Sequence, residues 1–155
     1  MLAVAEENVL INVDADSKEE VLRILTDLLV KNGCIKPEYY EIVRAREEQY
    51  PTGLPTEGVR VAIPHGFSTD CVLKPTVGIA TLTRPVVFHN MVAKDEELPV
   101  KLVFLFALTG EDAHSDDMQK VMGVFSDGDL LARIYAAKSG SEVAAIMSEP
   151  LGDSR

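Results

Sequence analysis

The chain has 155 residues, 46% of them hydrophobic and 26% charged, and its 25 acidic against 15 basic residues give a formal net charge of −10. This composition is typical of one globular domain with a substantial core, and the acidic balance argues against nucleic acid and anionic membranes as partners. The longest apolar run, 102–108, is far shorter than the roughly 20 residues of a membrane span. With no basic start to suggest a signal peptide and no Cys-x-x-Cys pair, we expect a cytoplasmic protein whose Cys34 and Cys71 stay reduced.

The first third of the chain predicts a strand followed by two helices. Residues 8–13 are typical of a short strand, and Ser17-Lys-Glu-Glu20 is a capping box that begins a helix with one apolar face. Asn32-Gly33 predicts a left-handed helix end. A second helix is expected from Pro37 to about Glu48.

Strand-like segments dominate the middle of the chain. Residues 50–58 contain two prolines and two glycines, which predicts an ordered loop. The last of the strands that follow is nearly all apolar and is expected to be central and covered on both faces. The expected strands are 59–63, 76–82, 86–88 and 100–108.

The remainder is predicted to be helical. Apolar residues recur at helical spacing from Met118 to Phe125 and again over 130–137, and Ser139-Gly-Ser-Glu142 is a further capping box. Helices before, between and after strands indicate an α/β fold, a three-layer sandwich with helices on both faces of a mixed sheet. We expect a single domain with its core over 8–148 and a disordered tail over 149–155.

His65 is the first candidate for chemistry. It follows an apolar strand in Ala62-Ile-Pro-His-Gly66, where proline fixes the backbone before the histidine and glycine permits a close approach behind it. Ligands tend to bind at strand ends in α/β sheets, and a rigidly held histidine suits nucleophilic or proton-transfer chemistry. The alternative is a turn histidine without a chemical role.

Three further residues are weighed in the same way. Arg46 lies near the end of a predicted helix, either as part of a solvated charge run or as a guanidinium that neutralises a phosphoryl group. His114, at the expected start of the helix carrying Met118, and His89, at a strand end, both fit ordinary surface positions.

The common motifs for metals, nucleotides and serine hydrolases are missing from the sequence. It contains no His-Glu-x-x-His, paired cysteine or EF-hand spacing, no glycine-rich nucleotide loop and no Gly-x-Ser-x-Gly. We therefore predict no metal site and no bound cofactor.

Taken together, three short motifs resemble a known family. Arg46-Glu47, then Pro51-Thr-Gly-Leu54, then Ala62-Ile-Pro-His-Gly66, in this order and spacing, are similar to the fructose/mannitol-type enzyme IIA of the bacterial sugar phosphotransferase system. The resemblance covers about residues 8–148. Residues 50–56 and 85–91 resemble the galactitol-type branch in particular.

This resemblance implies a phosphotransferase component of sugar transport. His65 would attack the phosphohistidine of the carrier protein HPr and pass the phosphoryl group to a cysteine on a IIB component, which serves a membrane IIC component. Arg46 would bind the phosphoryl oxygens, and His114 matches a second family histidine that orients the site. The residues expected to shape the phosphate pocket are Thr52, which adds a hydroxyl donor, Gly53 and Gly66.

Two other functions remain open from the sequence. A nitrogen-regulatory-type IIA paralogue would share these motifs and act by phosphorylation-dependent protein binding. A metal-dependent hydrolase using His65, His114 and acidic residues would lose its activity to chelators, but it lacks a ligand-spacing motif. Family precedent favours Nε2 as the phosphorylated nitrogen, and the sugar and the oligomeric state stay open.

Overall fold

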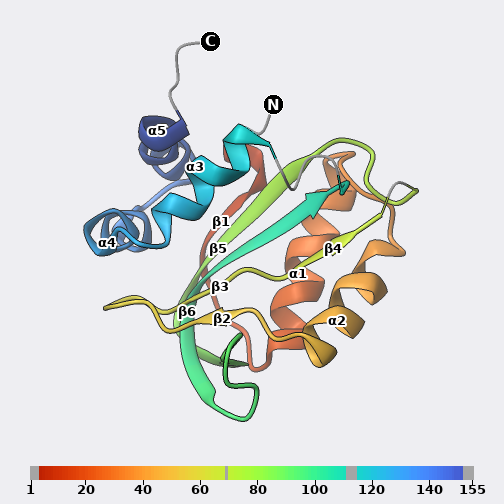
Figure 1. Ribbon diagram of the computed structural model, residues 1–155. Helices are drawn as coiled ribbons and strands as arrows, with labels where there is room; N and C mark the ends of the chain where they lie inside the picture. Colours follow the sequence, from red (N-terminus) through yellow and green to blue (C-terminus); the bar gives the residue numbers. More distant parts are fainter. Residues whose placement is uncertain (1–3, 69, 111–114, 152–155) are drawn as a thin grey trace.

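The computed structural model describes residues 4–68, 70–110 and 115–151, which form three layers with a mixed sheet in the middle (Figure 1). The sheet order is β1-β5-β6-β3-β2, with β4 also paired to β6. β5 and β6 are antiparallel, whereas β1 runs parallel to β5 and both β3 and β4 run parallel to β6. The strands are β1 (Val9–Val13), β2 (Gly53–Leu54), β3 (Val61–Ala62), β4 (His65–Phe67), β5 (Thr76–His89) and β6 (Glu97–Leu108).

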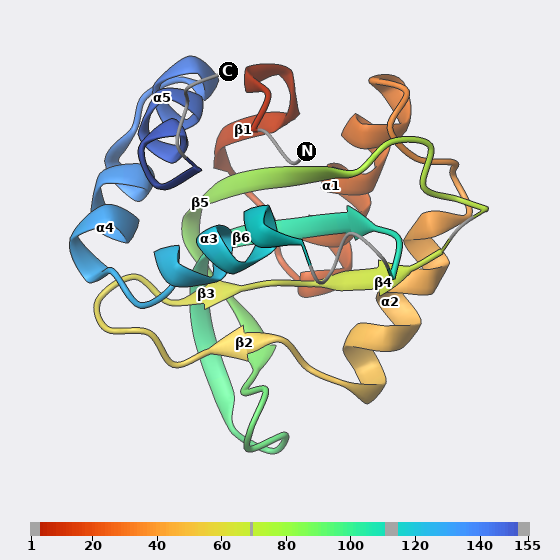
Figure 2. The same cartoon turned by 45° about the horizontal axis from the view of Figure 1, so that its top comes forward.

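Two sets of helices cover the two faces of this sheet, which confirms the predicted three-layer sandwich (Figure 1 and Figure 2). One face carries α1 (Lys18–Lys31) and α2 (Tyr39–Gln49). The other carries α3 (Asp116–Val124), α4 (Gly128–Ala136) and α5 (Gly140–Leu151), and a short 3-10 helix, η1 (Glu6–Asn8), precedes β1. Within the described part of the chain, none of the helices is both long and apolar enough to cross a membrane.

The central position of β6 follows from its sequence. Side chains of a strand alternate between faces, so a strand covered on both sides must be apolar at every position. Phe104 and Phe106 belong to the core under α3–α5, while Val103 and Leu105 belong to the core under α1 and α2, and all four are buried. The predicted central strand is confirmed.

The predicted start and end of α1 and the predicted start of α5 are confirmed by their caps. The Ser17 side chain accepts a hydrogen bond from the amide of Glu20, whose carboxylate in turn accepts one from the amide of Asp16. Gly33 adopts a positive φ of 76° just after α1, as a left-handed helix end requires. The same reciprocal arrangement joins Ser139 and Glu142 at the start of α5.

The sequence interpretation was wrong at four places. The two strands expected over 76–82 and 86–88 are one strand, β5, which contains a bulge that local patterning did not reveal. The expected loop over 50–58 includes the short strand β2, and the strand expected to end before His65 is followed by a separate strand, β4, that begins at His65. The expected disordered tail is helical as far as Leu151, which is buried against the core.

Candidate functional site

His65 is the first residue of β4, and the backbone around it is held from the central strand. β4 pairs with β6 in parallel, with His65 opposite Phe106, and the Phe106 amide donates a 3.0 Å hydrogen bond to the Pro64 carbonyl. Pro64 has no amide hydrogen and a restricted φ, so β3 and β4 are separated at this point. The backbone that carries His65 is therefore held rigidly, as the sequence suggested. The difference is that His65 begins a strand instead of following the end of one.

The imidazole of His65 is half-buried, and its tautomer is set by a backbone contact. Nδ1 lies 2.8 Å from the carbonyl oxygen of Ile63, which can only accept, so in the neutral ring Nδ1 carries the hydrogen and Nε2 carries the lone pair. Burial lowers the pKa of His65, and the positive charge of Arg46 lowers it further, against the opposing effect of the Ile63 contact. The ring is thus neutral and nucleophilic at Nε2 near pH 7.

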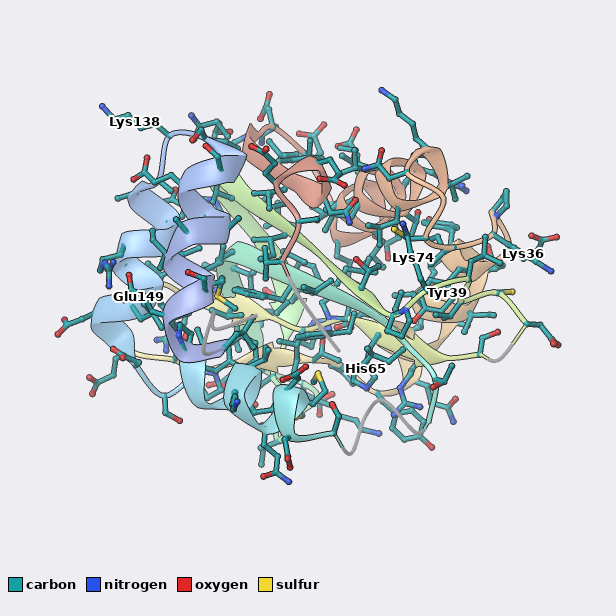
Figure 3. The ribbon with its side chains drawn as sticks, turned by 90° about the horizontal axis from the view of Figure 1, so that it is seen from above. Lys36, Tyr39, His65, Lys74, Lys138 and Glu149 are labelled. Carbon is teal, nitrogen blue, oxygen red and sulfur yellow. The ribbon has the colours of Figure 1, made fainter. Side chains whose placement is uncertain are left out.

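An apolar cavity of about 310 Å³ opens beside the imidazole. Its walls come from β6, α3, the segment after β5 and the residues in and just before β4, and Figure 3 shows His65 beside the α3 end of the molecule. The lining residues are Ile63, His65, Met91, Phe106, Leu108, Met118 and Met122. Met91 and Met122 are 38% and 43% exposed, so the imidazole sits in an accessible apolar surface.

Arg46 lies in the last turn of α2, half-buried, and close enough to His65 to influence its pKa. Its guanidinium carbon is 5.2 Å from the centre of the Tyr50 ring. Arg44, by contrast, forms ion pairs with Glu41 and Glu48 on the solvent side of the helix. The solvated charge run considered for Arg46 therefore describes Arg44, whereas the positive charge of Arg46 acts on His65.

Thr52 is brought to this region, but its hydroxyl is bound by Glu47. The Thr52 amide donates to one carboxylate oxygen of Glu47 at 2.9 Å and the Thr52 hydroxyl donates to the other at 2.7 Å. Both residues are buried, with 2% and 3% exposure. A phosphate-binding role for the Thr52 hydroxyl, as the sequence implied, is not supported by this arrangement.

Glu47 was quoted in the sequence motif but given no role of its own. Tyr39, Val43 and Glu47 are four residues apart and form the buried face of α2, so a carboxylate continues an apolar stripe. That pattern is the signal that could have found it. Burial raises the pKa of Glu47 to about 7, although both hydrogen bonds from Thr52 act in the opposite direction.

Glu47→Gln should change how stability depends on pH. Because the folded state holds the proton of Glu47 up to about pH 7 and the unfolded state releases it near 4.5, this group's contribution to stability falls as pH rises between those values. Between pH 5.5 and 8 the loss is about 2 kcal/mol, and it is absent in Glu47→Gln. Urea unfolding of both proteins at the two pH values measures the difference.

The matched control is Glu48→Gln, which removes an exposed carboxylate from the same helix. It should follow the wild-type pH dependence. If wild type and Glu47→Gln change in parallel between pH 5.5 and 8, Glu47 does not titrate in this range.

Gly53 and Gly66 are both needed for close packing within the chain. A Cβ at Gly66 would lie 2.7 Å from Cγ2 of Ile42 on α2, and one at Gly53 would lie 2.6 Å from the carbonyl oxygen of His89. Local sequence suggested that Gly66 admits another chain or a ligand. The group that approaches closely is instead α2 of the same chain.

Tyr39 is a second residue near His65 that the sequence analysis missed. Its buried hydroxyl lies 2.6 Å from the carbonyl oxygen of Gly66 and 2.8 Å from that of Phe106, and it accepts a 3.0 Å bond from the Gly66 amide. Burial raises the pKa of Tyr39 well above its ordinary value, so the hydroxyl remains protonated. Figure 3 shows Tyr39 and His65 in the same part of the molecule.

Tyr39→Phe should destabilise the fold by about 1–3 kcal/mol, because it leaves the buried Gly66 amide without its acceptor. Tyr40→Phe is the matched control: the Tyr40 ring stacks 3.6 Å from the Arg23 guanidinium carbon, and within the described residues its hydroxyl makes no hydrogen bond. Urea unfolding of the three proteins tests this. Equal midpoints for Tyr39→Phe and wild type would contradict the prediction.

Of the other two histidines, His89 lies in the part of the chain that the structure describes, and it does not line the cavity beside His65. His89 ends β5 and contributes its carbonyl to the packing at Gly53. His114 lies outside the described residues. Across the described ranges, no group of three or more His, Cys, Asp or Glu side chains is placed to hold a metal ion.

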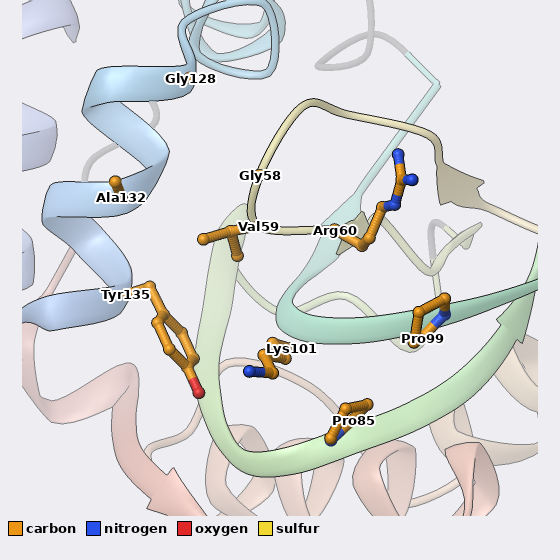
Figure 4. Close-up of a pocket in the computed structure, with 9 residues that line it drawn as sticks. All are labelled: Gly58, Val59, Arg60, Pro85, Pro99, Lys101, Gly128, Ala132 and Tyr135. Atoms are coloured by element: carbon orange, nitrogen blue, oxygen red, sulfur yellow. The ribbon is translucent and has the colours of Figure 1, made fainter.

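A second cavity, of about 400 Å³, lies between α4 and the segment before β3 (Figure 4). Arg60 and Lys101 both line it, but Figure 4 shows their side chains diverging. The Arg60 guanidinium donates to the Thr56 carbonyl, and the Lys101 ammonium lies 5.6 Å from the centre of the Tyr135 ring. The two cations therefore do not form one anion-binding site.

Comparison with known proteins is consistent with this geometry. The family model described as "Phosphoenolpyruvate-dependent sugar phosphotransferase system, EIIA 2" matches residues 3–149. A curated relative, the ascorbate-specific PTS system EIIA component of Escherichia coli K12, is 25% identical over 139 residues, covering 88% of this chain and 86% of the relative.

Solved structures agree in fold and sequence. The complex of enzyme IIA and phosphorylated enzyme IIB for mannitol from Escherichia coli is 26% identical with a TM-score of 0.77, over 96% of this chain and 99% of that one. The nitrogen regulatory protein IIA-Ntr from Neisseria meningitidis is also 26% identical, with a TM-score of 0.71 over 94% and 95% of the two chains.

Proposed function

Since the chain belongs to the EIIA 2 family of the phosphoenolpyruvate-dependent sugar phosphotransferase system, whose members are phosphotransferases, we propose that it carries a phosphoryl group on His65 from HPr to a IIB component. The observation that carries this proposal is the tautomer and the accessibility of the His65 imidazole. Nδ1 is bound to the Ile63 carbonyl, the lone pair is on Nε2, and the ring borders an accessible apolar cavity near Arg46. Such a carrier works in the cytoplasm, without cofactor or metal.

The transfer is a pair of in-line displacements. Nε2 of His65 attacks the phosphorus of the HPr phosphohistidine, the new N–P bond forms as the old one breaks, and the donor imidazole leaves with its electron pair. A cysteine thiolate of IIB then takes the phosphoryl group from Nε2. Arg46 neutralises charge on the phosphoryl oxygens, as the family resemblance implies.

Several site assignments stay proposals. The resemblance gives His114 the role of orienting the phosphorylated histidine, and it places Gly53 and Gly66 in the pocket wall. In the structure Gly66 also permits α2 to approach β4, and Gly53 permits β2 to approach the end of β5. Replacement of Gly66 by a larger residue should disturb the position of His65 through this packing.

The acceptor and the sugar are the finer part of the proposal. The sequence resembles the galactitol-type branch, the curated relative from Escherichia coli is ascorbate-specific, and a similar solved structure is a complex with the mannitol IIB. We propose galactitol as the sugar on the branch motifs. IIB proteins of all three types belong in the test.

A regulatory role is the second candidate. It is supported by the similarity to the nitrogen regulatory IIA-Ntr, at 26% identity over 94% of this chain. A regulator would accept the phosphoryl group on the same histidine but would not pass it to a sugar-specific IIB.

The test is a reconstituted relay. The protein is incubated with phosphoenolpyruvate, enzyme I and HPr, and its intact mass is measured before and after mild acid treatment. We expect an acid-labile gain of one phosphoryl group, which is lost when the cognate IIB is added. No gain with an active donor mixture would overturn the carrier role, and a gain retained with every IIB would favour regulation.

A further inference from the structure

We infer that Glu47 and Thr52 are positioning residues for His65, acting through a chain of hydrogen bonds that passes along the backbone of Thr52 and Ile63. The inference deepens the proposed function, since positioning matters for the transfer step at His65. It concerns two residues that do not line the cavity beside His65.

The chain has three consecutive links. Glu47 on α2 receives the amide and the hydroxyl of Thr52, at 2.9 and 2.7 Å. The carbonyl of Thr52 receives the amide of Ile63 at 3.2 Å, and the carbonyl of Ile63 receives Nδ1–H of His65 at 2.8 Å. Above the Glu47 pKa of about 7, where both of its oxygens accept, the buried carboxylate is therefore connected to the reacting imidazole by bonds in which each group donates or accepts as its chemistry allows.

The second link extends a very short sheet pairing. β2 and β3 are antiparallel over two residue pairs, Gly53 opposite Ala62 and Leu54 opposite Val61. The bond from Ile63 to Thr52 adds one more rung at the end nearest His65. A pairing of so few residues is weak on its own. The Glu47 carboxylate strengthens it, because it binds both the amide and the hydroxyl of Thr52 and so fixes the Thr52 carbonyl that accepts from Ile63.

A purely structural role would not require a carboxylate in this place. Glu47 is 3% exposed, and burying an ionisable group is costly compared with an apolar side chain of similar volume. The nearest charges that favour its ionised form are Lys18 and Arg46, and both Glu47 oxygens are used on Thr52. What the carboxylate provides is orientation of a peptide segment that ends at the imidazole.

The other side of His65 is held separately. The Tyr39 hydroxyl binds the amide and the carbonyl of Gly66, the residue after His65. The imidazole is thus fixed by α2 at two points, through Glu47 before it and Tyr39 after it. Releasing the Glu47 side should reorient the ring while β4 stays paired to β6.

Thr52→Val tests the inference because valine keeps the shape of threonine and removes the hydroxyl, leaving one Glu47 oxygen without its donor. Thr52→Ser restores the hydroxyl and is the matched control. The first readout is the ¹⁵N chemical shifts of the His65 ring, which report the ratio of Nδ1–H to Nε2–H tautomers above its pKa. The second is the rate of phosphoryl gain from phospho-HPr.

In Thr52→Val we expect the tautomer ratio to fall, and kcat to fall about 10- to 100-fold with KM for phospho-HPr unchanged, because misplacement of a reacting group lowers kcat. Thr52→Ser should return both to near wild-type values. A wild-type tautomer ratio in Thr52→Val overturns the inference. Wild-type protein that shows the Nδ1–H tautomer but gains no phosphoryl group would instead refute the proposed function.

Discussion

Replacing His65 with glutamine should abolish the phosphoryl gain and leave a folded protein. The glutamine amide can donate to the Ile63 carbonyl as Nδ1–H does, but it offers no nucleophilic nitrogen in place of Nε2. Because the covalent intermediate forms on this atom, the expected effect is complete loss and not a slower reaction. Intact mass after incubation with phosphoenolpyruvate, enzyme I and HPr measures it.

His89→Gln is the matched control for this prediction, since His89 contributes its backbone carbonyl, not its side chain, to the packing around Gly53. It should be phosphorylated at the wild-type rate. If His65→Gln still gains an acid-labile phosphoryl group, the nucleophile is a different residue and the assignment of His65 as the phosphoryl carrier is wrong.

Replacing Arg46 with glutamine should slow phosphoryl transfer by about 100- to 1000-fold, which is the usual cost of removing one donor that stabilises developing charge. The same change should raise the pKa of His65, because the charge of Arg46 lowers it in the native protein. The rate is measured by stopping the reaction with phospho-HPr at set times and determining the phosphorylated fraction. An NMR titration of the His65 ring gives the pKa.

Arg44→Gln provides the comparison on the same helix. Arg44 forms ion pairs with Glu41 and Glu48 at the surface, where such pairs contribute little, so its loss should leave the transfer rate unchanged. Arg46→Lys, which keeps the charge but loses the planar pair of donors, should fall between glutamine and wild type. Equal rates for the Arg44 and Arg46 variants would mean that Arg46 acts only as part of the general surface charge.

Much of the architecture could be read from local pattern. The capping residues Ser17 and Ser139, the glycine after α1 and the apolar run in β6 act through neighbours in sequence or through a strict period, so their positions were predictable. The mounting of His65 after a proline belongs to the same class. Arg46 was identifiable as a candidate because a family motif accompanied it.

The contacts that define the site depend on chain segments far apart in sequence. Tyr39 reaches Gly66 and Phe106 through the packing of α2 on the sheet, and neither partner can be inferred from the residues around Tyr39. β4 was missed because three residues after a proline carry no period, and they are a strand only by virtue of pairing with β6. The sequence suggests a phosphate-binding role for the Thr52 hydroxyl because nothing near Thr52 shows that Glu47 is buried and accepts the hydrogen bond from this hydroxyl.

The β5–β6 pairing also determines which part of the molecule should form first during folding. Its rungs begin at His89 opposite Glu97, so the hairpin can close from its tip with a small loss of chain entropy, whereas β1, β3 and β4 join across much longer loops. We therefore expect high kinetic φ-values, which measure how far native contacts are formed in the folding transition state, near Val86 and Val100, and low ones at Val61. They are obtained from the folding and unfolding rates of variants in which each valine is replaced by alanine. Low φ-values in the hairpin would refute this order. If the hairpin forms first as expected, the surroundings of His65 form after the rate-limiting step. Substitutions around His65 should therefore change the unfolding rate and leave the folding rate nearly constant.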